Sequence, residues 1–210
     1  MGIPVFILGE SGSGKSSSLR NFDVNEIGVF NVASKPLPFK KQIQRVNGAS
    51  YNTIIKGLSN PKLKSYAIDD SQFLLVFESF GRAKETGYGK FTDMALNFYN
   101  LVRFVIEKTP PDCIVYFLHH TEHTDDGRTK AKTIGKMLDN QLTVEGMFSI
   151  VLLCKTDGNK HYFETQSDGA TTAKSPMDMF DREIDNDLKM VDTTIREYWG
   201  LTQDKNKEEK

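Results

Sequence analysis

Eight residues close to the amino terminus match a motif whose residue types suit the binding of phosphate groups. Residues 9–16 read GESGSGKS and fit the pattern G-x-x-x-x-G-K-[ST] at every fixed position. Glycines let main-chain N–H groups curl around phosphate oxygens, and we expect Lys15 to reach the β- and γ-phosphates of a nucleotide. Ser16 would offer its hydroxyl to Mg²⁺. The expected nucleotide-binding residues are Gly9, Glu10, Ser11, Gly12, Ser13, Gly14, Lys15, Ser16 and Ser17.

The flanking sequence gives this loop the context that the motif requires. Residues 3–8 (IPVFIL) form a continuous apolar run, as expected for a strand buried on both faces of a parallel sheet. Residues 15–21 begin a predicted helix, whose amino-terminal dipole favours phosphate. A loop that only turns the chain is the alternative, which this strand and helix disfavour.

Two adjacent aspartates end another predicted strand. Tyr66-Ala67-Ile68 leads into Asp69 and Asp70. A strand end holds a carboxylate rigidly, and phosphate-bound Mg²⁺ needs only one or two protein oxygens, so Asp69 is the predicted metal ligand. Asp70 is the candidate base that polarises an attacking water. A supporting role behind Asp69 and the capping of the following helix are the alternatives for Asp70.

Three histidines follow a third apolar strand candidate, residues 114–118 (IVYFL). A polar side chain at such a strand end can hydrogen-bond the γ-phosphate or the attacking water. We assign this role to His120, with His119 as the alternate. A zinc site with His123 is disfavoured, because no cysteine or acid cluster lies at ligand spacing. A histidine satisfied by main-chain groups is the other interpretation.

The remaining pattern predicts strands that alternate with helices, which indicates an α/β fold. The segment between residues 35 and 60 gives a weak pattern, and residues 121–136, which are polar and charged and interrupted by two glycines, are predicted to be a mobile loop. Asp157-Gly158-Asn159 is a strong hairpin signal, and Thr92 is the expected N-cap of its helix. The predicted strands span residues 3–8, 29–33, 65–68, 114–118, 148–153 and 161–165, and the predicted helices residues 15–21, 72–80, 92–108 and 186–199.

Composition excludes several classes of protein. The 210 residues are 38% hydrophobic and 26% charged, which is typical of a globular chain. The formal net charge of −1 gives no general attraction to nucleic acid or membranes, and no apolar run approaches the length of a membrane span. We expect one domain over residues 1–201, a disordered charged tail over 202–210, and a cytoplasmic location. The two cysteines are expected to be buried thiols, with a disulfide as the alternative.

Other nucleotide-binding classes fit less well. Residues 154–157 (CKTD) resemble the guanine-reading [NT]-K-x-D motif only in part, because cysteine replaces the first residue, so ATP is favoured over GTP. A small-molecule kinase would need an arginine-rich lid. The arginines at positions 82, 103, 128 and 182 are scattered along the chain.

Four segments together resemble the phage-encoded, single-domain, RecA/RadA-like ATP-binding proteins, several of which are known or proposed single-strand annealing recombinases. They are GESGSGKS, YAIDD at 66–70, FLHHTEH at 117–123 and TQSDGATTAKSP at 165–176. The resemblance covers the chain up to Leu201. It implies a RecA-like P-loop NTPase fold, with a mainly parallel central sheet flanked by helices and a carboxy-terminal β-hairpin. In a phage protein, the cytoplasm would be that of the host cell.

The resemblance also implies how the site is built. The histidine-bearing strand would lie between the loop strand and the acid-tipped strand, with His120 beside the γ-phosphate. Subunits would form rings or filaments with ATP at their interface, and Lys174 is the candidate finger from a neighbouring subunit; a solvated lysine is the alternative. The family's catalytic Glu is missing, because residues 30–35 (FNVASK) contain no acid. Hydrolysis would then be slow, use Asp70, or depend on a partner.

Single-stranded DNA is the expected partner, together with a single-strand binding protein. The DNA-binding candidates lie in residues 127–136 (GRTKAKTIGK) and are Arg128, Lys130, Lys132 and Lys136. Such contacts to phosphates are independent of sequence and sensitive to salt. The basic stretches at 35–45 and 81–90 could assist, and plain solvated surface is the alternative. A nucleotide-gated assembly module with little hydrolysis, and a small-molecule phosphotransferase, are the competing functions.

Overall fold

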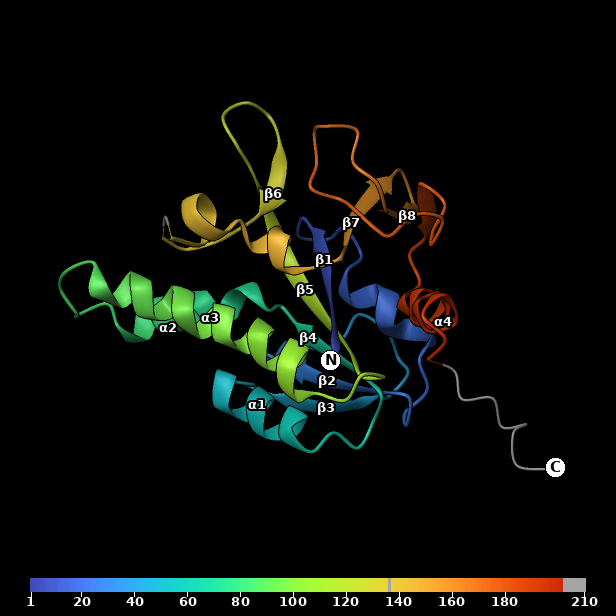
Figure 1. Cartoon of the computed structure of the whole chain (residues 1–210), viewed down its shortest axis with the longest axis horizontal. Helices are drawn as coiled ribbons and strands as arrows, with labels where there is room; N and C mark the ends of the chain where they lie inside the picture. The colour runs from blue at the N-terminus through green and yellow to red at the C-terminus, as the bar shows by residue number, and fades with distance from the viewer. Residues whose placement is uncertain (136, 202–210) are drawn as a thin grey trace.

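The computed structural model describes residues 1–135 and 137–201 of the chain, so that Lys136 and the expected tail lie outside the described residues. The described strands form one mixed sheet in the order β3-β2-β4-β5-β1-β7-β8-β9, with β6 paired to β5 (Figure 1). The strands are β1 (Ile3–Gly9), β2 (Ile27–Asn31), β3 (Gln44–Asn47), β4 (Ser65–Asp69), β5 (Ile114–His123), β6 (Thr129–Ala131), β7 (Ile150–Asp157), β8 (Lys160–Glu164) and β9 (Glu183–Asp185). Neighbours from β3 to β7 run parallel, and β6, β8 and β9 run antiparallel to their partners.

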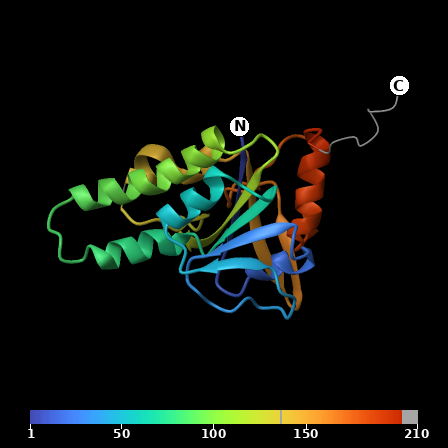
Figure 2. The ribbon, with the colours of Figure 1, turned by 90° about the horizontal axis from the view of Figure 1, so that it is seen from below.

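Helices cover both faces of this sheet. On one face lie α1 (Tyr51–Ser59), α2 (Gln72–Gly81) and α3 (Gly89–Lys108), and on the other lie α4 (Leu188–Tyr198) and the 3₁₀ helix η1 (Ser16–Asn21). Figure 2 shows α2 and α3 running side by side away from the sheet. The π-helical turn η2 (Met137–Leu142) and the 3₁₀ turn η3 (Val144–Met147) join the first face. The predicted α/β class, a mainly parallel sheet flanked by helices, is confirmed.

The central strands are buried on both faces because their side chains alternate between two hydrophobic clusters. In β1, Phe6 and Leu8 belong to the cluster under α1, α2 and α3, whereas Val5 and Ile7 belong to the cluster under α4 and η1. The same alternation runs through β5 and β7. The predicted hairpin is also confirmed, since Asp157 pairs with Lys160 across a two-residue turn in which Gly158 has a φ of +56°.

Several boundaries differ from the sequence-based predictions. The helix expected from residue 92 begins at Gly89, after Tyr88, so Thr92 is not its N-cap; Phe91 packs against the core and favours the earlier start. β3 and α1 were both missed in the weak segment. β3 is wholly exposed and shows no apolar alternation, but α1 has a Ser50 cap that accepts from the Thr53 N–H.

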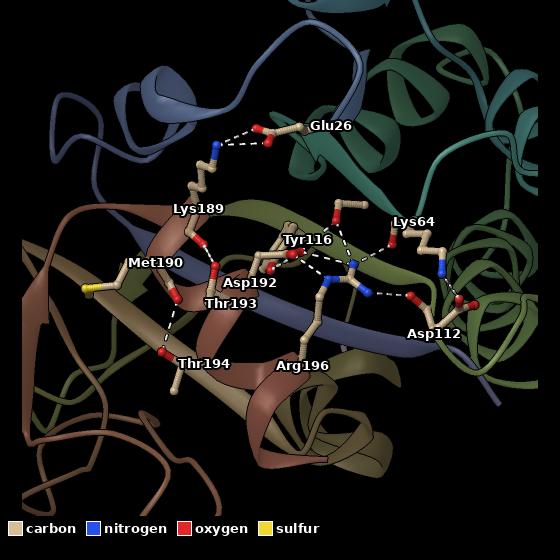
Figure 3. A network of polar contacts seen from close by, with 11 residues as sticks. Glu26, Lys64, Asp112, Tyr116, Lys189, Met190, Asp192, Thr193, Thr194 and Arg196 are labelled. Carbon is tan, nitrogen blue, oxygen red and sulfur yellow. Dashed lines mark hydrogen bonds and ion pairs between the residues drawn. The ribbon is translucent and has the colours of Figure 1, made fainter. Parts of the chain in front are cut away.

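At its amino-terminal edge, the sheet holds α4 through an ion pair between the buried Asp192 and the partly buried Arg196 (Figure 3). Arg196 donates to Asp192, with Nε and Oδ2 2.6 Å apart, and Asp192 also accepts from Ser65 Oγ at 2.6 Å and Tyr116 OH at 3.0 Å. The guanidinium further donates to the main-chain carbonyls of Lys64 and Asp112. Every charge in this cluster therefore has a partner from the protein.

Cys113 and Cys154 are buried free thiols, as expected. Among the helices of the described residues, none combines the length and apolar character needed to cross a bilayer.

Candidate functional site

The sheet order brings three of the predicted site segments to one edge. β5 lies between β1 and β4, and the register sets Gly9 opposite His120. Asp69 ends β4 at the same edge, opposite Asn31 of β2. Because parallel strands end together, the glycine-rich loop (residues 9–16), the aspartates and the histidines meet there. The expected position of the histidine-bearing strand is thus observed.

The glycine-rich loop encloses the ammonium group of its own lysine. Lys15 Nζ donates to the carbonyls of Gly9 at 2.8 Å and Glu10 at 2.7 Å, and burial lowers the pKa of Lys15 to about 8. Gly12 and Gly14 have φ values of +82° and +102°, a region that favours glycine. In the part of the chain that the structure describes, the N–H groups of Ser11, Gly12 and Gly14 have no acceptor.

The β7–β8 hairpin packs against the glycine-rich loop and donates hydrogen bonds to it. The sequence did not reveal these contacts. The Ser13 carbonyl accepts from His161 Nδ1 at 2.7 Å and from Cys154 Sγ at 2.9 Å. A Cβ atom on Gly14 would come within 2.9 Å of the His161 ring, so glycine is required for this close approach. The hairpin therefore fixes the outer half of the loop.

The helix that follows the loop is shorter and tighter than expected. Residues 16–21 form one 3₁₀ helix, which ends at Phe22. Serine hydroxyls compete for main-chain partners, and Ser18 Oγ bonds the Lys15 carbonyl, which disfavours a regular α-helix. Its dipole therefore contributes less to phosphate binding than the sequence suggested.

Ser16 and Asp69, the two predicted metal ligands, are in direct contact. Ser16 Oγ donates to Asp69 Oδ1 at 2.7 Å. Asp69 is 5% exposed, and its burial raises the pKa of the carboxyl group, an effect that the Ser16 hydrogen bond opposes. Asp69 Oδ2 accepts no hydrogen bond from any described residue. The described residues contain no cluster of three or more His, Cys, Asp and Glu side chains that could hold a metal ion.

Asp70 lies beside Asp69 and has a left-handed backbone, with a φ of +58°. Its Oδ2 is 2.8 Å from Lys35 Nζ, and its Oδ1 is 3.2 Å from His120 Nε2. Burial alone would raise the pKa of Asp70, but the hydrogen bonds from His120 and Lys35 lower it to about 2. The capping interpretation of Asp70 is wrong: Ser71 is the N-cap of α2, and no side chain caps that helix.

The two adjacent histidines occupy different environments. His119 is fully buried against the rings of Phe6 and Phe98, where burial lowers its pKa to about 3. Its Nε2 donates to the Lys132 carbonyl at 2.8 Å. His120 instead faces Asp70, so of the two it is the one that belongs to the site.

The expected mobile loop at 121–136 contains an ordered hairpin, and that prediction was wrong. β5 continues to His123, and Thr121 pairs with Ala131 of β6. The β-branched Thr121 and Thr129 suit paired strands, and Gly127 supplies the turn with a φ of +80°. The sequence was misleading because the polar residues conceal this short, half-exposed ladder.

Three of the four DNA-binding candidates lie on this hairpin or just after it. Arg128 pairs with Asp126 at 3.1 Å, and Lys130 pairs with Glu122 at 3.2 Å. Lys132 is exposed. Lys136 lies outside the described residues. Acidic neighbours on the hairpin thus balance part of its positive charge.

The hairpin contacts the glycine-rich loop directly. His123 Nε2 donates to Glu10 Oε1 at 2.8 Å, and its Nδ1 lies 3.2 Å from Thr129 Oγ1. A cavity of about 400 Å³ lies between the loop, the hairpin and the end of β7. A movement of the glycine-rich loop can therefore shift the β5–β6 hairpin through the hydrogen bond between Glu10 and His123.

Lys174 does not join the site within this chain. Its main chain pairs with Val151, three positions before Cys154, the residue that lies opposite Gly9. The predicted role of Lys174 requires a second subunit.

No protein-family model matches the chain, and no curated protein matches it. Function must therefore be inferred from the geometry of the site.

Proposed function

We propose that the protein is a RecA-like P-loop ATPase that binds ATP and Mg²⁺ at the glycine-rich loop and acts in DNA recombination or single-strand annealing. The observation that carries this proposal is the 2.7 Å contact between Ser16 and Asp69. It unites the hydroxyl of the loop motif with a strand-end carboxylate 53 positions away. A loop that merely turned the chain would have no need of this partner.

The residues present fit a magnesium-bound triphosphate. Ser16 and Asp69 offer hydroxyl and carboxylate oxygens, the ligands that Mg²⁺ prefers, and Asp69 Oδ2 has no protein partner among the described residues. The free N–H groups of the loop suit phosphate oxygens. When bound, the metal ion would neutralise phosphate charge. Lys15 would contact the β- and γ-phosphates, and Asp70 with His120 would orient the attacking water.

A nucleotide-gated assembly module with little turnover is the second candidate, and one observation favours it. Both oxygens of Asp70 already accept hydrogen bonds, from Lys35 and His120, which limits its capacity to hold a water. In this alternative, ATP binding would reposition the β5–β6 hairpin for a partner, through the contact between Glu10 and His123.

Single-stranded DNA is the proposed partner of that hairpin, supported by Arg128, Lys130 and Lys132. The bond between Glu10 and His123 supports coupling between nucleotide and DNA. Assembly into rings or filaments, with Lys174 reaching a neighbouring subunit, belongs to the same proposal.

Nucleotide binding tests the central claim. Calorimetric titration with ATP and Mg²⁺ should give saturable binding to the wild type, and Lys15→Ala should weaken it about 100-fold. Lys189→Ala is the matched control, since Lys189 lies on α4 and pairs with Glu26. Near-wild-type affinity in the Lys15 variant would refute the assignment of the loop.

A second measurement tests the DNA role. Binding of a fluorescent single-stranded oligonucleotide, at low salt with a non-hydrolysable ATP analogue, should be lost when Arg128, Lys130 and Lys132 are changed to Glu. Reversal of Lys56, Lys62 and Lys108, exposed lysines outside all the basic stretches named above, is the control. If the wild type ignores DNA, the recombination role fails while ATP binding stands. ATP turnover that stays negligible with DNA present would favour the assembly module.

A further inference from the structure

Lys35, in the turn that follows β2, is anchored at the edge of the site. Its Nζ lies 2.8 Å from Asp70 Oδ2 and 4.7 Å from the centre of the Phe73 ring. Its main-chain carbonyl accepts a 2.7 Å hydrogen bond from the side chain of Asn31, a fully buried residue. The fold thus fixes the main chain of Lys35, although 57% of the side chain remains exposed.

The turn after β2 is also hydrogen-bonded to β4, the strand that ends in Asp69 and is followed by Asp70. The Val32 N–H donates to the Asp69 carbonyl at 3.2 Å, and Asn31 lies opposite Asp69 in the sheet. Because β4 and β5 lie between β2 and β1, Lys35 and Lys15 approach the aspartates from opposite sides. The sequence showed only that residues 30–35 contain no acidic residue. The structure shows that this segment instead places the Lys35 ammonium group beside Asp70.

We propose that Lys35 makes the site distinguish a triphosphate from a diphosphate, by exchanging Asp70 for the γ-phosphate of the bound nucleotide. This inference rests on the proposed ATP binding. A lysine is a compact charge on a flexible stem, and a terminal phosphate offers it more charge and more acceptor oxygens than one carboxylate. The exchange also frees Asp70 Oδ2 for a water. A cation from the same chain thereby contacts the terminal phosphate without a neighbouring subunit.

Binding of two nucleotides measures this role. The affinities for a non-hydrolysable ATP analogue and for ADP, each with Mg²⁺, are determined by calorimetry for wild type and Lys35→Met. We expect the triphosphate to bind about 10- to 100-fold more weakly to the variant, with the ADP affinity unchanged within about twofold. Lys35→Arg should retain most of the selectivity. Lys41→Met, in the same segment but paired with Asp23, is the control and should match the wild type.

A double variant separates a phosphate contact from an indirect effect. If Lys35 only neutralises Asp70, adding Asp70→Asn to Lys35→Met restores triphosphate binding, which overturns the proposal. If Lys35 contacts phosphate, the double variant stays weak. Equal losses for both nucleotides, or no loss, also overturn it. Thermal unfolding checks each variant, and Lys35→Gln, which also removes the charge, replaces Lys35→Met in the test should Lys35→Met unfold. A wild type that binds neither nucleotide refutes the proposed function as well, and needs no variant to show it.

Discussion

Each edge of the parallel sheet buries an aspartate, Asp192 at one and Asp69 at the other. The two carboxylates differ in the partners that surround them. Asp192 packs at the amino-terminal edge, where Arg196 and the hydroxyls of Ser65 and Tyr116 surround its carboxylate. Asp69 ends β4 at the opposite edge, where the Ser16 hydroxyl is the partner of its carboxylate. Both side chains are nearly inaccessible, so burial alone does not distinguish them.

The difference lies in how the buried charge is compensated. A buried charge is tolerated when a counter-charge and hydrogen bonds satisfy it, as Arg196 and its neighbours do for Asp192. Asp69 has the Ser16 hydroxyl but no cation in contact among the described residues, and its burial raises the pKa of the carboxyl group. The amino-terminal edge is therefore a closed structural cluster. The carboxy-terminal edge keeps an oxygen that a bound cation could use, which is typical of a functional site.

The largest expected effect comes from breaking the closed cluster. Arg196→Met leaves Asp192 charged and buried without its counter-ion, so the free energy of unfolding should fall by about 3–5 kcal/mol. Chemical denaturation at pH 7 measures this loss. The paired change Asp192→Leu with Arg196→Met should recover much of it, because no uncompensated charge then remains.

A surface ion pair made by another residue of α4 provides the control. Lys189→Met removes the exposed ion pair with Glu26 and should change the free energy of unfolding by less than about 1 kcal/mol. An Arg196 variant as stable as the Lys189 variant would show that the amino-terminal cluster is not the closed network described above.

His119 provides an intermediate effect at the carboxy-terminal edge. Burial lowers its pKa from the usual 6.5 to about 3 in the folded chain, so between these pH values the unfolded chain binds more protons. The free energy of unfolding therefore falls as the pH falls, and His119 accounts for a loss of about 2 kcal/mol between pH 8 and pH 5. Denaturation should show that the difference in free energy of unfolding between wild type and His119→Gln becomes smaller by this amount when the pH is lowered from 8 to 5.

Ser71→Ala is the matched control for His119. It removes the hydroxyl that lies 2.9 Å from the His119 ring but leaves the imidazole in place. Its difference from wild type should stay constant from pH 8 to pH 5. If the His119→Gln difference also stays constant, His119 takes up its proton in the folded chain, and burial does not keep its imidazole neutral.

The sequence predicted those parts of the fold whose signals are local. Apolar runs identified β1 and β5, and the turn residues around Gly158 identified the β7–β8 hairpin. β3 was missed because its four residues are exposed and carry no apolar periodicity. The β5–β6 hairpin was mistaken for a loop, because charged side chains on a half-exposed ladder hide the alternation.

The site was predictable where a motif or a strand end marks it, and only there. Lys15, Ser16 and Asp69 follow from the loop pattern and the strand that ends in acids. Lys35 follows a predicted strand, but its contact with Asp70 depends on sheet order and on the anchoring of the turn by Asn31. Such contacts between distant segments leave no local signal in the chain.

The smallest effect on stability is expected at Asp69, where the comparison of the two edges is sharpest. Asp69→Asn removes the charge and keeps the shape, so without nucleotide the free energy of unfolding at pH 7 should stay within about 1 kcal/mol of wild type or increase. Because burial raises the pKa of Asp69 above its usual value of 3.8, the folded wild type binds a proton more readily than the unfolded chain. Its stability therefore declines as the pH rises through that range, and the variant lacks this decline.

Denaturation at pH 4, 5.5 and 7 without Mg²⁺ should thus show that the free energy of unfolding of Asp69→Asn increases relative to that of the wild type as the pH rises. In the same variant, nucleotide binding should lose its dependence on Mg²⁺. Asp187→Ala is the control with the opposite sign: it removes the carboxylate cap of α4 and should lower the free energy of unfolding by about 1 kcal/mol. If Asp69→Asn instead destabilises the chain by more than about 2 kcal/mol, Asp69 is a structural residue like Asp192, and the two edges of the sheet do not differ in the way that a metal site requires.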